Sequence, residues 1–112
     1  MLVGVPKEIK VHEYRVGLTP SSVRELITHG HQVVVQANAG TAIGLTDDMY
    51  KAAGADIVPS AADVFAKADM VVKVKEPQAP EIKMLRPGQV LFTYLHLAPD
   101  PEQTEGLLKS DC

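Results

Sequence analysis

The sequence has 112 residues, a formal net charge of −3 and an apolar fraction of 46%, which are the values of one globular domain with its own core. The acidic balance argues against nucleic-acid or anionic-membrane partners, which need a clustered basic face. No apolar run approaches the roughly 20 residues of a membrane span, and Lys7 comes too early for a signal peptide. Since Cys112 is the only cysteine, we expect no disulfide and a cytoplasmic location.

The first 20 residues predict a short strand, a charged loop and the start of a helix. The strand covers residues 2–5, and Thr19 followed by Pro20 is typical of a helix N-terminus, because Thr accepts from free amides and Pro suits the first helical position. Arg15 lies in the loop. Its planar guanidinium could hold a carboxylate or a phosphate by two oxygens, although most such arginines are simply solvated.

The rest of the chain alternates between helices and strands. The first helix begins at Pro20 and stops before Gly30. It is followed by a strand at 31–36, a loop at 38–45, a helix at 46–53 and a strand at 55–58. We then expect a helix at 60–68, a strand at 70–74, one or two helical turns at 80–85, a strand at 89–95 and a helix at 101–109.

This alternation is typical of βαβ units. We therefore expect an α/β fold of the Rossmann-like, three-layer kind, with a mainly parallel sheet of about five strands and helices on both faces. We find no internal repeat or linker, so residues 1–112 are predicted to form a single domain.

Three polar side chains follow predicted strands at their carboxyl ends, where parallel sheets bind ligands. Arg15 follows the first strand, Lys75 the fourth and His96 the fifth. An arginine can hold a carboxylate, a lysine can polarise a carbonyl oxygen, and a histidine can transfer a proton near neutral pH. Together they predict a site for a small 2-oxo acid, although each residue alone is also explained as a solvated strand end or, for His96, a packed histidine.

Other patterns carry less chemistry. His29 and His31 have no third ligand nearby, so we expect no metal site. The glycines of residues 40–44 match neither a dinucleotide fingerprint nor a P-loop. No Ser-His-Asp or Cys-His arrangement is legible.

Three separated motifs resemble the N-terminal signature of alanine dehydrogenases, within the alanine dehydrogenase and pyridine nucleotide transhydrogenase family. They are residues 4–10 (Gly-Val-Pro-Lys-Glu-Ile-Lys) with 13–16 (Glu-Tyr-Arg-Val) and 19–20 (Thr-Pro), residues 72–77 (Val-Lys-Val-Lys-Glu-Pro), and residues 91–97 (Leu-Phe-Thr-Tyr-Leu-His-Leu). The resemblance implies an NAD-dependent enzyme, usually a hexamer, that interconverts L-alanine with pyruvate and ammonia. It also implies that Arg15 and Lys75 bind pyruvate and that His96 is the catalytic acid/base.

Two alternatives stay open at this point. The NAD-binding subunit of proton-translocating transhydrogenase has a similar opening, but the histidine of the third motif is absent in that family, whereas residues 94–99 keep it here. The other alternative is a non-catalytic binding or assembly module that keeps the fold without the chemistry.

The resemblance stops short of a complete enzyme. Alanine dehydrogenases continue into a nucleotide-binding domain, and no strand followed by Gly-x-Gly-x-x-Gly occurs in this chain. We therefore expect an N-terminal substrate-binding domain whose NAD is held by a domain absent from this chain, and which does not turn over alone.

Overall fold

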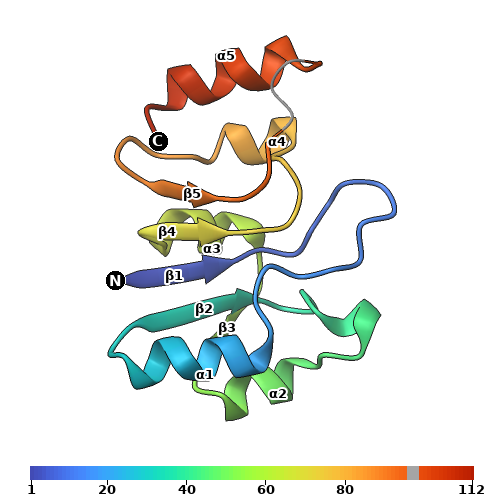
Figure 1. Ribbon diagram of the computed structural model, residues 1–112, viewed down its shortest axis with the longest axis vertical. Helices are drawn as coiled ribbons and strands as arrows, with labels where there is room; N and C mark the ends of the chain where they lie inside the picture. Colours follow the sequence, from blue (N-terminus) through green and yellow to red (C-terminus); the bar gives the residue numbers. More distant parts are fainter. Residues whose placement is uncertain (96–98) are drawn as a thin grey trace.

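The computed structural model describes residues 1–95 and 99–112, and its centre is a five-stranded sheet (Figure 1). The strands are β1 (Leu2–Val5), β2 (Gln32–Gln36), β3 (Asp56–Val58), β4 (Met70–Val72) and β5 (Val90–Phe92), in the order β3-β2-β1-β4-β5. Every neighbouring pair is parallel. The predicted parallel α/β architecture is confirmed.

The helices begin where the sequence placed cap residues. They are α1 (Pro20–Thr28), the 3₁₀ helix η1 (Thr41–Ile43), α2 (Asp47–Ala52), α3 (Ala61–Lys67), α4 (Ala79–Ile82) and α5 (Pro101–Ser110). The side chains of Thr19, Thr46, Ser60 and Asp100 each accept a hydrogen bond from a first-turn backbone N–H, which satisfies an amide that the helix cannot. Within the part of the chain that the structure describes, no helix has the length and apolar character needed to cross a membrane.

Alternate residues of the central strands bury their side chains on opposite faces of the sheet. Val3 and Val33 belong to one apolar cluster with Tyr50 of α2, whereas Val34 packs in another with Val64 of α3. Figure 1 shows α1 and α2 in front of the sheet and α3 behind it. This arrangement confirms the three layers, since helices cover both faces.

The strand order places a switch point between β1 and β4. The chain first winds outward from β1 to β3, and then returns through α3 to the other side of β1. The loops that leave β1 and β4 therefore run in opposite directions, and open sheets of this kind bind ligands in the crevice between two such loops.

Two strands end earlier than the sequence suggested. The predictions of strand at 70–74 and at 89–95 are wrong at their carboxyl ends, because β4 stops at Val72 and β5 at Phe92. Beyond Phe92 the strand has no neighbour to pair with, since β4 has ended on one side and the other side is the sheet edge. The predicted loop at 38–45 also contains η1.

We predict that Tyr50→Phe lowers the free energy of unfolding by about 1 to 2 kcal/mol. The fully buried Tyr50 hydroxyl donates a 2.7 Å hydrogen bond to the backbone oxygen of Leu18, and the variant leaves that carbonyl without this donor. Urea unfolding measures the change. The matched control is Tyr94→Phe, because Tyr94 is 79% exposed, and an equal loss in both variants would contradict the prediction.

The same hydroxyl also makes stability depend on alkaline pH. Burial raises the pKa of Tyr50 to about 12 from its ordinary value of 10.0. Since the folded chain holds this proton more tightly than the unfolded chain, the stabilisation is complete below pH 10 and is lost as the pH rises towards 12. Tyr50→Phe is expected to lack this component of the alkaline loss.

Candidate functional site

The crevice at the switch point is formed by two loops. The loop at residues 6–19 connects β1 to α1, and the segment at 73–78 follows β4. They border a surface cleft of about 420 Å³ that is lined by both Arg15 and Lys75. The structure thus brings together two of the three side chains that the sequence placed at this edge, whereas His96 lies outside the described residues.

Arg15 is held by Glu13, which sequence reasoning did not single out. The Nε and Nη2 atoms of Arg15 donate to the two Glu13 carboxylate oxygens at 3.0 and 2.8 Å, and the Arg15 backbone N–H donates to the same carboxylate. This contact occupies one edge of the guanidinium. The opposite edge, which includes Nη1, has no hydrogen bond to the residues that the structure describes, so a bound carboxylate would meet the guanidinium end-on.

The charge of this pair is stable over a wide pH range. Hydrogen bonding from the Arg15 side chain lowers the pKa of Glu13 to about 2, and the Glu13 carboxylate in turn raises the pKa of Arg15. The Arg15 side chain is 64% exposed, whereas that of Glu13 is only 6% exposed. The buried Glu13 carboxylate therefore holds the Arg15 side chain in place, while the exposed guanidinium lines the cleft.

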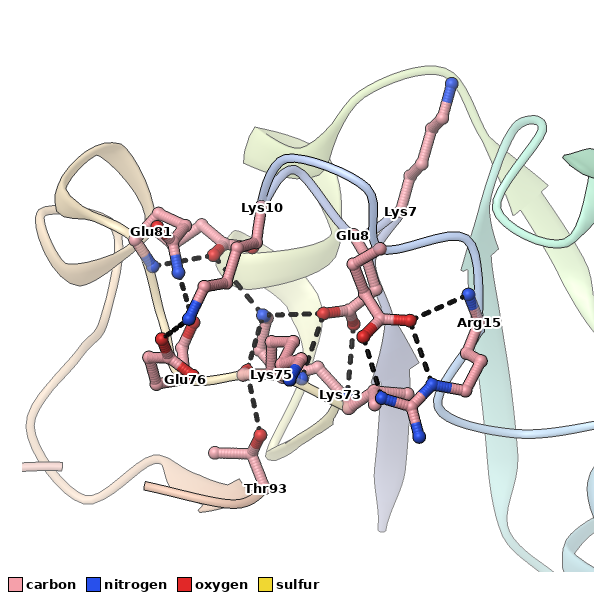
Figure 2. Close-up of polar contacts among 12 residues, drawn as sticks. Lys7, Glu8, Lys10, Arg15, Lys73, Lys75, Glu76, Glu81 and Thr93 are labelled. Atoms are coloured by element: carbon pink, nitrogen blue, oxygen red, sulfur yellow. Dashed lines mark hydrogen bonds and ion pairs between the residues drawn. The ribbon is translucent and has the colours of Figure 1, made fainter. Parts of the chain in front are cut away.

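Lys75 lies three residues beyond the end of β4 and not at the strand end predicted from the sequence. Its backbone N–H donates to Glu8 Oε1 at 3.1 Å, and its carbonyl accepts from Lys73 Nζ at 2.8 Å and from Thr93 Oγ1 at 2.9 Å. Figure 2 shows these contacts around the backbone of Lys75. The Lys75 ammonium group makes no hydrogen bond or ion pair within the described part of the chain, and it is available to a ligand.

Two ion pairs join the loops that carry these side chains. Glu8 from the first loop pairs with Lys73 at 3.1 Å, and each side chain is only 1% exposed. Lys10 from the first loop pairs with Glu76 from the second. Each loop thus contributes one acid and one lysine, so the two loops are held together without net charge.

Lys73 also contacts the carboxylate of Glu81 in α4, at 3.4 Å. Burial raises the pKa of Glu81, and the hydrogen bond from the Gln78 N–H opposes the rise, as does Lys73. Glu81 Oε2 has no hydrogen-bond partner among the residues described. Burial is therefore the main reason that the pKa of Glu81 is raised, and the nearby Glu8 carboxylate adds to it.

Sequence reasoning did not single out Glu8, Lys73 or Glu81 as site residues. One signal was present. Lys73 interrupts the apolar run of the strand expected at 70–74, and a buried lysine requires an acidic partner. Which acid would provide it could not be read from the sequence, since Glu8 is 65 residues away.

The comparisons with known proteins place the chain in a family. The pattern of the alanine dehydrogenase/PNT N-terminal domain matches residues 4–112. The chain belongs to this family. It is 54% identical over 110 residues to alanine dehydrogenase of Halomonas elongata and 51% identical over 110 residues to that of Mycobacterium tuberculosis, covering 98% of this chain and 30% of each relative.

Solved structures agree with this assignment. The domain superposes on an L-alanine dehydrogenase with a TM-score of 0.95 and 52% identity, covering 98% of this chain and 30% of that one. A transhydrogenase from Sinorhizobium meliloti gives a TM-score of 0.91 and 32% identity, covering 99% of this chain and 33% of that one. The domain therefore spans about a third of the length of the proteins it matches.

We predict that Arg15→Gln raises the pKa of Glu13 from about 2 towards or beyond the ordinary value of 4.5. The variant removes the charged hydrogen bonds that favour the carboxylate, while the burial that opposes ionisation stays. NMR titration of the Glu13 carboxyl carbon measures the shift, with Arg24→Gln on the exposed face of α1 as the control.

The lowered pKa of Glu13 also makes the stability of the folded chain depend on acidic pH. Because the Glu13 pKa is lowered in the folded chain, the pair contributes its full stabilisation above about pH 4.5 and loses it as the pH falls towards 2. Acid unfolding of the Arg15→Gln variant should lack this component. A Glu13 pKa that stays near 2 without Arg15 would contradict the assignment.

Proposed function

We propose that this chain is the substrate-binding domain of an NAD-dependent L-alanine dehydrogenase, which converts L-alanine, NAD and water to pyruvate, ammonia and NADH. The observation that carries the proposal is the cleft at the switch point, where a guanidinium edge and an ammonium group without partners among the described residues line one surface. The match to the family's N-terminal domain supports the same reading.

The two cationic groups suit a small 2-oxo acid. The end-on edge of Arg15 would bind the carboxylate, since two parallel N–H donors fit two carboxylate oxygens. The Lys75 ammonium would donate to the adjacent carbonyl oxygen and withdraw electron density from the carbon that ammonia attacks. His96 would then transfer a proton to or from that oxygen as the acid/base, a role that only the resemblance and the sequence position support.

NAD does not fit the residues of this chain. In dinucleotide-binding domains a glycine-rich turn after the first strand lets the backbone approach the pyrophosphate. Here the turn after β1 begins with Pro6 and carries the buried Glu8, whose carboxylate already accepts from the β4 loop. We therefore propose that the cofactor is held by a separate nucleotide-binding domain, and that the isolated chain is inactive.

The similarity to a transhydrogenase supports a second candidate, an N-terminal part of a transhydrogenase subunit. Alanine dehydrogenase is favoured because the relatives of that name are 50–54% identical to this chain, against 32% for the transhydrogenase. The histidine kept in the third motif points the same way.

We also propose that this domain contacts other protein surfaces. Large apolar side chains are exposed along β5 and α5, including Phe92 at 67% and Leu108 at 78%, and such surfaces are typical of protein contacts. They support assembly with other parts of a longer protein and with further copies, a hexamer by family resemblance. The single cysteine supports a cytoplasmic location.

We predict that the 112-residue chain binds pyruvate and that Arg15→Gln weakens binding at least about tenfold, because the variant removes the charged bidentate contact. Amide NMR titration gives the dissociation constant and locates the shifts. Arg24→Gln removes an exposed arginine outside the cleft and should bind like the parent. Absence of pyruvate-induced shifts near Arg15 and Lys75 would contradict a preformed site.

We further predict that His96 is required for turnover. A chimera that joins this chain to the remaining part of the Halomonas elongata enzyme should oxidise NADH with pyruvate and ammonium, and His96→Ala should lower kcat about 10²- to 10⁴-fold, as expected for a lost acid/base. His29→Ala is the matched control, since the His29 side chain is 73% exposed at the C-cap of α1. A chimera that loses less than about tenfold through His96→Ala would favour the non-catalytic module.

A further inference from the structure

We propose that Glu8 is a positioning residue that sets the separation between the Arg15 guanidinium and the Lys75 ammonium. The inference deepens the proposed function and rests on it. Glu8 makes no hydrogen bond or ion pair with either group that would bind the substrate, and its effect would be transmitted through the backbone of the β4 loop.

Side chains provide the hydrogen bonds of the backbone around Lys75. The last main-chain bond of this strand end runs from the Lys73 N–H to the Phe92 oxygen at 3.1 Å. Beyond it, the N–H groups of Val74 and Lys75 donate to Glu8 Oε2 and Oε1 at 3.0 and 3.1 Å. A single carboxylate therefore takes the place of a neighbouring strand where the strand has ended.

The Glu8 carboxylate is itself held in place by a buried ion pair. Glu8 Oε1 also accepts from Lys73 Nζ at 3.1 Å, and both side chains are 1% exposed. Lys73 in turn donates to the Lys75 carbonyl at 2.8 Å. Buried charges at this spacing are ordered by each other and are weakly screened by salt, so both the N–H and the carbonyl of Lys75 are tied to one ion pair.

Glu8 and Arg15 belong to the same loop, residues 6–19. That loop also approaches the end of β4 closely at Gly17, where an added Cβ would lie 2.5 Å from the Val72 oxygen. The Glu8 contacts therefore fix the segment carrying Lys75 against the loop carrying Arg15, as Figure 2 shows. The carboxylate and carbonyl of a 2-oxo acid are directly bonded, and they need two cations at one fixed spacing. If the spacing between the Arg15 guanidinium and the Lys75 ammonium is fixed before binding, less conformational entropy is lost when the ligand binds.

The test compares Glu8→Gln with Glu81→Gln. The Glu8→Gln side chain keeps one acceptor oxygen, but its amide nitrogen cannot accept from the second backbone N–H. Glu81→Gln is the matched control, because it also replaces a buried carboxylate beside Lys73, whereas the hydrogen bonds and ion pairs of Glu81 go to Gln78 and Lys73 and not to the backbone of Val74 or Lys75. The Glu81→Gln side chain retains an oxygen for Lys73.

A second pair keeps the test decisive if Glu8→Gln does not fold. Thr93→Val removes the hydroxyl that donates to the Lys75 carbonyl at 2.9 Å with little change of shape, and Thr93→Ser restores it. Thr93→Val should loosen Lys75 in the same direction and to a smaller extent, and Thr93→Ser should return it to the parent value.

Two readouts are recorded for each variant. The first is the ¹⁵N order parameter of the Lys75 amide without ligand, expected to fall from about 0.85 to below about 0.6 in Glu8→Gln and to stay at the parent value in Glu81→Gln. The second is the dissociation constant for pyruvate, expected to rise about tenfold in Glu8→Gln. Both results together support the proposal, because Glu81→Gln also replaces a buried carboxylate beside Lys73 but removes no acceptor of the Lys75 amide.

The outcomes separate this inference from the proposed function. An unchanged Lys75 order parameter in Glu8→Gln, or in Thr93→Val where Glu8→Gln is unfolded, overturns the positioning role. A loosened Lys75 with unchanged pyruvate affinity overturns it as well. A parent chain that binds no pyruvate overturns the proposed function. The role of Glu8 in ordering Lys75 is still tested in that case, because the order parameters are measured without ligand.

Discussion

At the carboxyl ends of β1 and β4, a carboxylate and an ammonium group lie almost wholly out of water, 3.1 Å apart. Burying either charge alone would be strongly unfavourable, and breaking such a pair by removing one member typically costs about 3 to 5 kcal/mol. Glu8 and Lys73 remain buried because each satisfies the other and both also bond to the backbone of the β4 loop. The position of the cleft depends on this pair, since it joins the two loops that border the switch point.

The arginine at the cleft is arranged differently. The contact between Arg15 and Glu13 lies at the surface, where salt screening weakens ion pairs, and the pair adds orientation more than stability. Its effect is to occupy one guanidinium edge and to leave the other towards the cleft. The site therefore combines a lysine whose backbone is anchored by a buried network with an arginine whose side chain is aimed by a neighbouring carboxylate.

Much of the fold could be predicted from local patterns. Thr19 caps the helix whose start the Thr-Pro pair predicted, because capping depends only on residues within one turn. The central strands were found from their apolar runs, since burial on both faces requires such runs. The ends of β4 and β5 were not, because a strand stops where its neighbours stop, and neighbours are not adjacent in the sequence.

The candidate site also has features that the sequence predicts and features that only the tertiary structure shows. By itself, the sequence predicted that Arg15, Lys75 and His96 follow strands of a parallel sheet, and its motifs identified the family. Only the tertiary structure decided that Lys75 lies beyond its strand, that Glu13 takes one edge of Arg15, and that Glu8 meets Lys73. The contact between Glu8 and Lys73 depends on the strand order β3-β2-β1-β4-β5, which brings together side chains 65 residues apart. Local propensity carries no information about pairings at that separation, because they form only when the sheet assembles.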